Sequence, residues 1–205
     1  MMATRLYTAA QVRALDQAAI HTLGIPGYAL MQRAADAAWR VLRARWPQAQ
    51  RIVVLCGTGN NGGDGYLVAR LAREAGMDVN VIALAQPNGQ GDAARACADW
   101  QAAGGTNLPL SADLPSADVY VDALFGTGLA RPVEGVARAL IERVNAGRRP
   151  VLALDVPSGA NADTGGVLGI AVRAAVTVTF VAHKRGLFTG AALDHCGEQI
   201  GRAHV

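Results

Sequence analysis

The segment from Gly57 to Gly65 has the residue types of a phosphate-binding loop. It reads Gly-Thr-Gly-Asn-Asn-Gly-Gly-Asp-Gly, so five of its nine residues are glycines and two are asparagines. Glycine permits positive φ angles and lets backbone N–H groups approach an anion at the N-terminus of a following helix. The segment therefore predicts a site for the phosphates of a nucleotide. A simple tight turn is the alternative explanation of such a Gly/Asn cluster.

The spacing Gly57-x-Gly59-x-x-Gly62 formally matches the fingerprint of dinucleotide-binding proteins. That fingerprint also needs an acidic residue at the end of the next strand, and residues 84–87 read Leu-Ala-Gln-Pro. The Gly-Lys-Ser/Thr sequence of a Walker A loop does not follow the glycines either. These departures argue against an ordinary NAD-dependent dehydrogenase and against a Walker A protein.

Three oxygen-bearing side chains stand at or just beyond the ends of predicted strands: Asn61, Asp122 and Ser158. Together with backbone carbonyls, such donors can hold a hard cation without any cysteine or histidine. Asp122 lies within an otherwise apolar strand, so a carboxylate that caps nearby loop amides explains it equally well. Both interpretations stay open from the residues alone.

Asp155 follows the apolar run 151–154 and precedes Pro157, which lacks an amide donor. A carboxylate at that position, next to glycine-rich loops, is a candidate general acid or base. A turn-forming or N-cap aspartate is the alternative. The sequence His183-Lys184-Arg185 adds potential cations for a phosphate, and Lys184 is the only lysine of the chain. For His183 and Arg185, a solvated charged turn is an equally good explanation.

The elements that must position these residues alternate between strand and helix. Apolar runs predict strands, and periodic segments closed by Gly or Pro predict helices. The predicted strands span residues 51–56, 79–84, 118–124, 150–154 and 174–180. The predicted helices span residues 8–23, 26–46, 64–75, 92–103 and 134–146. The β-branched alternation of residues 174–180 favours a more exposed strand.

Repeated strand–helix–strand order predicts right-handed crossovers and a mostly parallel sheet. The expected fold is a single α/β domain over residues 1–205, a three-layer αβα sandwich of Rossmann-like type with two N-terminal helices. Those two helices should form a cap or an oligomer surface. Ligands of such sheets bind outside the carboxyl ends of the strands. The glycine-rich loops at residues 57–65, 126–132 and 155–159 should therefore open on one edge.

Composition excludes several classes of protein. The net charge is only +3 and no dense basic run occurs, which argues against a nucleic-acid partner. No apolar stretch approaches the ~20 residues that a membrane helix needs. Residues 1–5 lack the apolar core of a signal peptide. The separated cysteines Cys56, Cys97 and Cys196 indicate reduced thiols, so we expect a cytoplasmic protein with no membrane partner.

Four motifs in sequence order resemble those of the NAD(P)H-hydrate epimerases, the YjeF N-terminal domain family. They are Cys56–Gly65, Val121–Leu129, Leu154–Gly159, and Thr177–Phe180 followed by Lys184–Leu187. The resemblance extends over nearly the whole chain. It implies an isomerase that interconverts the R and S forms of hydrated NADH and NADPH. These damaged cofactors carry a hydroxyl at C6 of the reduced nicotinamide ring.

The resemblance also implies which residues form the site. A potassium ion would be bound by Asn61, Asp122 and Ser158. Asp155 would move a proton to or from the C6 oxygen, by way of either an iminium or a ring-opened aldehyde. The implied substrate contacts are Asn60, Asn61, Gly62, Gly63, Asp64, Gly126, Thr127, Gly128, Leu129, Ala130, Arg131, Pro132 and Asp155.

In this family a dehydratase that uses ADP or ATP and is specific for the S form restores the cofactor. It is either a separate protein or a C-terminal domain, and residues 184–194 look like those of the two-domain proteins. We expect no dehydratase activity from these 205 residues, and either a free-standing epimerase or an excised domain. The N-terminal helices make a homodimer plausible.

Two alternatives belong to other functional classes. One is a non-catalytic nucleotide- or protein-binding module of the same fold. The intact Asn-Asn-Gly-Gly-Asp sequence, with Asp155 and Ser158, argues against it. The other is a different Rossmann-type enzyme, such as a methyltransferase or a dehydrogenase, against which the missing acidic residue after Leu84 counts.

Overall fold

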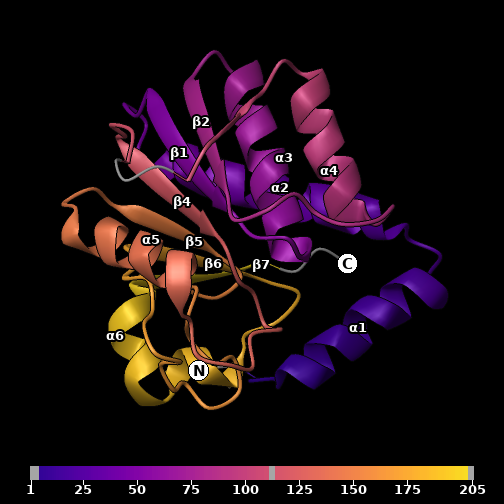
Figure 1. Cartoon of the computed structure of the whole chain (residues 1–205). Coiled ribbons are helices and arrows are strands. Elements are labelled where there is room, and N and C mark those ends of the chain that lie inside the picture. The colour runs from indigo at the N-terminus through magenta and orange to yellow at the C-terminus, as the bar shows by residue number, and fades with distance from the viewer. Residues whose placement is uncertain (1–4, 111–113, 203–205) are drawn as a thin grey trace.

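A parallel sheet forms the centre of the computed structural model, which describes residues 5–110 and 114–202 (Figure 1). Residues 1–4, where the sequence predicts no signal peptide, lie outside the described ranges. Every strand pair of the sheet is parallel, as the sequence predicts. The strand order is β3-β2-β1-β4-β5-β6-β7. The strands are β1 (Arg51–Cys56), β2 (Asp78–Ala83), β3 (Asn107–Leu108), β4 (Val119–Ala123), β5 (Val151–Leu154), β6 (Val176–Phe180) and β7 (Glu198–Arg202).

Helices cover both faces of this sheet, so the predicted three-layer α/β sandwich is confirmed. Successive residues of β1 alternate between two apolar clusters, because side chains of a strand point to opposite faces. Ile52 and Val54 pack in the cluster that contains α2, α3 and α4, whereas Val53 and Leu55 pack in the cluster that contains α5. The helices are α1 (Ala9–His21), α2 (Gly27–Arg45), α3 (Asn60–Glu74), α4 (Asp92–Ala102), α5 (Gly135–Ala146) and α6 (Leu193–Cys196).

The two N-terminal helices have different positions. The α2 helix packs with α3 in one layer of the sandwich, so it is no cap. The α1 helix lies apart from the sheet, on the side where the strands end (Figure 1). It begins at a capping box, in which the Thr8 hydroxyl accepts from Gln11 N and the Gln11 side chain accepts from Thr8 N. Both helices reach the strand ends, since α1 lies on that side and residues of α2 such as Leu30 and Met31 line the cavity there.

The expectation that residues 174–180 form a more exposed strand is wrong. All five residues of β6 are buried. The reason is β7, which pairs with β6 along its whole length, from Val176 opposite Glu198 to Phe180 opposite Arg202. The polar sequence of β7 gave no signal for a strand.

The α3 helix starts at Asn60, four residues before the predicted start at Asp64. The connection from β1 is short because its backbone lies directly against β4. Gly57 N donates to Ala123 O over 2.9 Å. A Cβ atom on Gly57 would lie 1.8 Å from Leu124 O, and one on Gly62 would lie 2.0 Å from Gly57 O. Residues 60–63, which the sequence assigns to a loop, therefore form the first turn of the helix.

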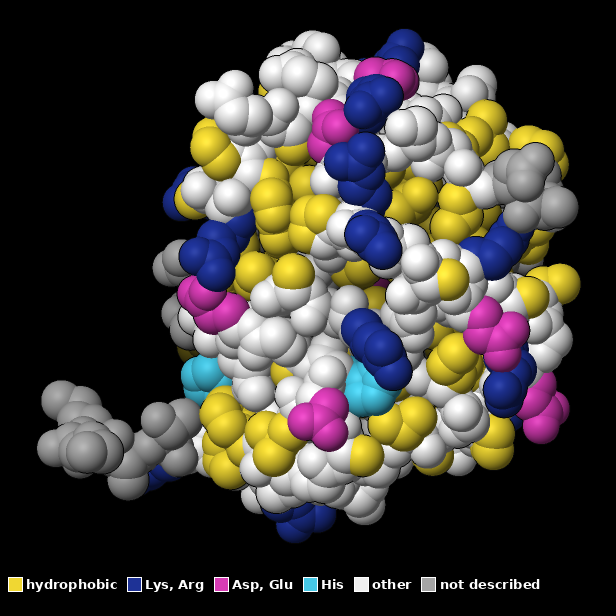
Figure 2. Space-filling view, turned by 90° about the vertical axis from the view of Figure 1, so that its left-hand side faces the viewer, with side chains coloured by type: hydrophobic (Ala, Val, Ile, Leu, Met, Phe, Trp, Pro, Cys, Tyr) yellow, Lys and Arg dark blue, Asp and Glu magenta, His cyan; other side chains and the backbone are white. Residues whose placement is uncertain are grey.

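The face of the molecule shown in Figure 2 carries side chains of both charges, as the modest net charge leads us to expect. On the face shown in Figure 2, basic side chains form a narrow line with acidic and apolar side chains beside them. Among the helices of the described residues, none has the length and apolarity needed to cross a membrane. The expected absence of a nucleic-acid partner stays a prediction.

The close backbone contact at Gly62 gives a prediction for stability. Alanine normally favours a helix over glycine, yet the Gly62→Ala methyl group would overlap the Gly57 carbonyl. We expect this variant to lower the free energy of unfolding by more than about 2 kcal/mol, measured by urea denaturation. The control is Gly91→Ala at the start of α4, where nothing lies within 4 Å of an added Cβ. Equal stability of both variants would contradict the packing described.

Candidate active site

A cavity of about 1020 Å³ lies at the carboxyl ends of the strands, between the sheet and α1. The loops after β1, β4 and β5 all line it, which confirms that the three glycine-rich loops open on one edge. The strand order reverses there, because β1 is flanked by β2 on one side and β4 on the other. This is the position at which open parallel sheets bind ligands. The volume is large enough for a dinucleotide.

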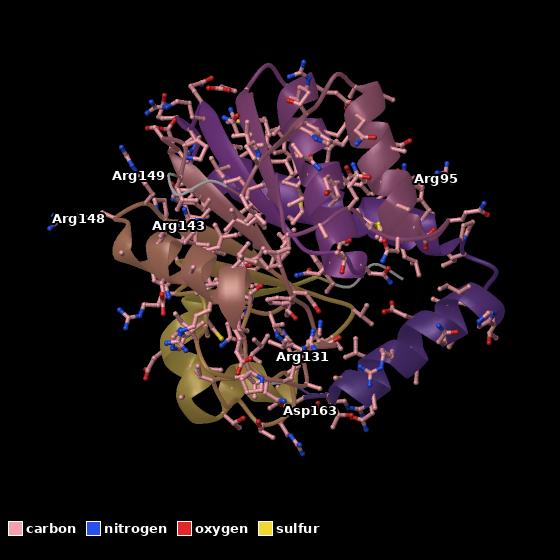
Figure 3. The ribbon with its side chains drawn as sticks, in the orientation of Figure 1. Arg95, Arg131, Arg143, Arg148, Arg149 and Asp163 are labelled. Carbon is pink, nitrogen blue, oxygen red and sulfur yellow. The ribbon has the colours of Figure 1, made fainter. Side chains whose placement is uncertain are left out.

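Most of the residues predicted to contact a substrate line this cavity. Those present are Asn60, Asn61, Asp64, Gly126, Thr127, Gly128, Leu129, Ala130, Arg131 and Asp155. Arg131 extends between α1 and the strand ends (Figure 3). Gly62, Gly63 and Pro132 are not part of the lining. Gly63 is buried against Met31 and Ala93 instead, since an added Cβ would lie 2.7 Å from Met31 Sδ.

Asp155 forms an ion pair with Lys184 at the floor of the cavity. The Lys184 Nζ atom donates to Asp155 Oδ1, to Thr179 Oγ1 at 3.0 Å and to Phe180 O at 2.6 Å. The Lys184 side chain is 1% exposed and that of Asp155 is 16% exposed. All three ammonium donors are therefore used within the protein, and none is left for the phosphate that the sequence suggests as a partner of Lys184.

Asp155 itself and Val181, which follows the Phe180 carbonyl bonded to Lys184, have unusual backbone angles. Asp155 has φ +68° and Val181 has φ +65°. Aspartate tolerates this left-handed region because its short side chain can bond locally, whereas a β-branched residue there is strained. Such strain is typical of functional sites. The residue type of Val181 gave no indication of it.

Three more carboxylates line the same cavity: Asp64 on α3, Asp16 on α1 and Asp92 at the start of α4. Burial raises the pKa of Asp64 well above its usual value, and Asp155 and Asp16 raise it further. Burial also raises the pKa of Asp16, with a further contribution from Asp155. The Lys184 ammonium opposes both shifts. Asp16 is absent from the sequence prediction, because a lone acidic residue on an amphipathic helix is usually solvated.

Asp122 lies behind the cavity wall, at the end of β4, and is fully buried. It accepts hydrogen bonds from Ser158 N (2.8 Å), Ser158 Oγ (2.6 Å) and Leu124 N (3.3 Å). The capping interpretation of Asp122 is thus realised. Each of these donors is neutral, and burial raises the pKa of Asp122 to about 6. A buried carboxylate without a described cationic partner leaves a negative charge that a cation would offset.

Asn61 lies close to the same loops and is 8% exposed. Neither its amide nitrogen nor its amide oxygen has a hydrogen-bond partner in the structure. An added Cβ on Gly126 would lie 3.2 Å from Asn61 Cβ and 3.5 Å from Asp155 Oδ2, so these residues are neighbours. Buried polar atoms normally have partners. The orphaned amide therefore fits a residue that binds a ligand or an ion.

These donors restrict the kind of metal that fits. Within residues 5–110 and 114–202, no group of three His, Cys, Asp or Glu side chains could hold a metal ion. The three cysteines are free and buried. A cation at Asn61, Asp122 and Ser158 would be bound by amide, carboxylate and hydroxyl oxygens, which are the ligands of hard ions.

Comparison with known proteins identifies relatives of the chain. The sequence pattern of the family described as "YjeF-related protein N-terminus" matches residues 27–186. The NAD(P)H-hydrate epimerase of Limosilactobacillus fermentum is 42% identical, over 97% of this chain and 96% of that protein. The bifunctional NAD(P)H-hydrate repair enzyme Nnr of Coxiella burnetii is 48% identical, over 96% of this chain but only 41% of its own length.

A solved structure supports the fold. The crystal structure of the yeast protein YNL200c superimposes with a TM-score of 0.79, over 89% of this chain and 82% of that one. At 19% sequence identity, the similarity concerns the fold.

The ion pair of Lys184 and Asp155 gives a second prediction. Lys184→Met keeps the side-chain length but leaves the Asp155 carboxylate without its cation. We expect the free energy of unfolding to fall by about 3 kcal/mol, measured by chemical denaturation.

Adding Asp155→Asn to that variant should restore part of the loss, because a neutral amide needs no counter-ion. The neighbouring Arg185 is exposed, and Arg185→Met should cost less than about 1 kcal/mol. Wild-type stability of Lys184→Met would show that the buried pair contributes nothing.

Proposed function

The chain belongs to the YjeF-related N-terminal family, and from that premise we propose that it is an NAD(P)H-hydrate epimerase. It is an isomerase that interconverts the R and S forms of NADH and NADPH hydrated at C6. The single observation that carries the proposal is the position of Asp155. This carboxylate lines a dinucleotide-sized cavity next to the N-terminus of α3.

The first turn of α3 provides the binding position for the phosphates of the substrate. The backbone N–H groups at the start of a helix have no carbonyl partner within it, and the helix dipole favours an anion there. The pyrophosphate of the substrate takes this position, beside Asn60 and Asn61. Arg131, on the loop after β4, adds positive charge to the lining. The hydrated ring then lies toward Asp155.

Inversion at C6 requires that one bond to this carbon breaks and forms again. Either the C6–O bond breaks and an iminium forms with the ring nitrogen, or the C6–N bond breaks and the ring opens to an aldehyde. Both routes need a proton at the C6 oxygen, and Asp155 supplies or removes it. A positioned acid or base of this kind contributes about 10²–10⁴-fold. Lys184 acts through Asp155, because its ammonium fixes the orientation of that carboxylate.

A potassium ion is part of the proposal, and Asn61, Asp122 and Ser158 would hold it. The orphaned Asn61 amide and the buried Asp122 charge support this assignment. Bound there, the ion supplies positive charge that offsets Asp122 and the phosphates. Its ligands come from α3, β4 and the loop after β5, so binding also joins these segments.

The product of the reaction requires a second enzyme. We propose that a dehydratase specific for the S form and dependent on ADP or ATP consumes it, either as a separate protein or as a further domain. The name of the bifunctional relative supports this pairing. Three buried free thiols support a cytoplasmic location. Exposed Leu15 on α1 and Leu23 just beyond its end favour a homodimer.

The activity is tested with racemic hydrated NADH and an S-specific dehydratase. The R form is then consumed only as fast as it epimerises, and the protein should accelerate that slow phase above the spontaneous rate. Asp155→Asn should reduce the acceleration about 10²–10⁴-fold with unchanged KM. Asparagine is the suitable replacement because it tolerates positive φ.

Asp194→Asn is the control, since Asp194 is exposed and lies outside the cavity. A wild-type protein that leaves R consumption at the spontaneous rate would refute the proposed activity. A non-catalytic binding module of the same fold would then be the better explanation.

The cation is tested by thermal unfolding in KCl and in choline chloride at equal ionic strength. A ligand present at 100 times its Kd stabilises the folded state by about 2.7 kcal/mol, so the melting temperature should rise with potassium. Asp122→Asn should abolish the potassium-dependent rise. Asp118→Asn removes a carboxylate that is bonded to Arg51 and should lower stability without changing the response to potassium. A rise that survives in Asp122→Asn would place the ion elsewhere.

A further inference from the structure

Asp16 is one of the cavity carboxylates that the proposed mechanism leaves without a role. It projects from α1 into the lining of the cavity that also contains Asp155, Lys184 and Asp64. Asp155 lies at the carboxyl end of β5, whereas Asp16 lies on the helix that is apart from the sheet on the same side (Figure 1). The cavity therefore has a carboxylate on each of two walls formed by different elements.

The position of Asp16 on α1 is set by the buried face of that helix. Val12 and Ala19 are 4% and 2% exposed. Asp16 lies four residues after Val12 and three before Ala19, so it shares their face. Asp16 itself is partly buried, and desolvation of a carboxylate is unfavourable unless it has a partner or a function. Within the described residues, Asp16 forms no hydrogen bond and no ion pair.

The α1 helix is fixed to the segment that carries the ion pair. Tyr7 N donates to His183 O over 2.8 Å, and Arg185 N donates to Tyr7 O over 2.9 Å. The Asp163 carboxylate accepts from Ala9 N at 2.6 Å, and Figure 3 shows Asp163 at this end of α1. The segment that contains Lys184 thus also holds the start of α1. This attachment keeps Asp16 on the side of the cavity that faces the ends of the strands.

Lys184 does not neutralise Asp16 by direct bonding. Its ammonium protons are bonded to Asp155, Thr179 and Phe180. Burial and the Asp155 charge raise the pKa of Asp16, so it holds a proton more readily than an ordinary aspartate. The orphaned amide of Asn61, in the same lining, independently indicates that a ligand enters between these walls.

We propose that Asp16 is a second catalytic residue, which serves the face of the hydrated ring opposite the face served by Asp155. This inference rests on the proposed epimerase function and commits it to the iminium route. Ring opening would need only one acid–base group, because the aldehyde can rotate and close again on the same side.

The step balances with two carboxylates and one water molecule. One carboxylic acid gives its proton to the C6 hydroxyl, the C–O bond breaks and that oxygen leaves as water, and the nitrogen lone pair forms the C6=N bond of the iminium. Water then adds to C6 from the opposite face, and the C=N electrons return to nitrogen. The second carboxylate accepts the proton lost by that water. The two groups exchange roles in the reverse reaction, and nothing is oxidised or reduced.

The test uses each purified epimer of hydrated NADH in water enriched in oxygen-18. Inversion is followed by chromatography and oxygen exchange by mass spectrometry, after subtraction of the spontaneous rates. Asp16→Asn should invert at least about 10²-fold more slowly than the wild type. It should still exchange the oxygen of one epimer without inversion, since Asp155 still serves one face. Asp155→Asn should show the opposite preference between the epimers.

The matched control is Asp36→Asn, because Asp36 is an exposed carboxylate on α2 outside the cavity lining. Asp16→Asn should also keep its melting temperature, since a neutral amide avoids a desolvated charge. Wild-type inversion by Asp16→Asn overturns the proposal. Equal loss of exchange for both epimers also overturns it, because Asp16 would then only position the site. If the wild type itself does not accelerate inversion, the epimerase function fails as well.

Discussion

The ion pair between Lys184 and Asp155 links the parts of the molecule that form the cavity. Its carboxylate stands at the end of β5, and its ammonium also bonds residues at the end of β6. The backbone beside Lys184 pairs with Tyr7 and so fixes the entry to α1. A charge pair removed from water is stable only when its hydrogen bonds are complete. Residues at the ends of β5 and β6 satisfy that requirement, because Thr179 and Phe180 accept the remaining Lys184 donors.

The backbone contact between the loop after β1 and the end of β4 supplies the other wall. At Gly57 and Gly62 no side chain fits, so the main chain of two segments touches directly. This contact brings the first turn of α3 to the strand ends and buries Asn61 beside Gly126. Ser158 then connects Asp122 with the loop after β4, because its hydroxyl accepts from Phe125 N and donates to Asp122. The backbone packing at the glycines and the hydrogen bonds of Asp122 thus hold the same three loops together.

Sequence patterns predicted the structural features that depend on local periodicity. The strands with long apolar runs and the convergence of the three loops agree with the structure. The patterns failed where distant residues decide the outcome. Residues 60–63 form a helix because the Gly57 backbone packs against Leu124, and β6 is buried because β7 pairs with it. Lys184 is buried because it forms an ion pair with Asp155. Asp16 gave no signal, because its relation to Asp155 exists only once α1 is in place.

The positive φ of Asp155 has a consequence for protein engineering. An ordinary L-residue in this conformation costs roughly 1–2 kcal/mol, and Asp, Asn and Gly are the types that tolerate it best. Replacement of Asp155 by the longer glutamate would therefore strain the backbone as well as move the carboxylate. A designer who wishes to adjust the acidity of this group has to work through its neighbours instead. Thr179 is a suitable position for such a substitution. Its hydroxyl accepts from the Lys184 ammonium, and its replacement leaves the backbone of Asp155 unchanged.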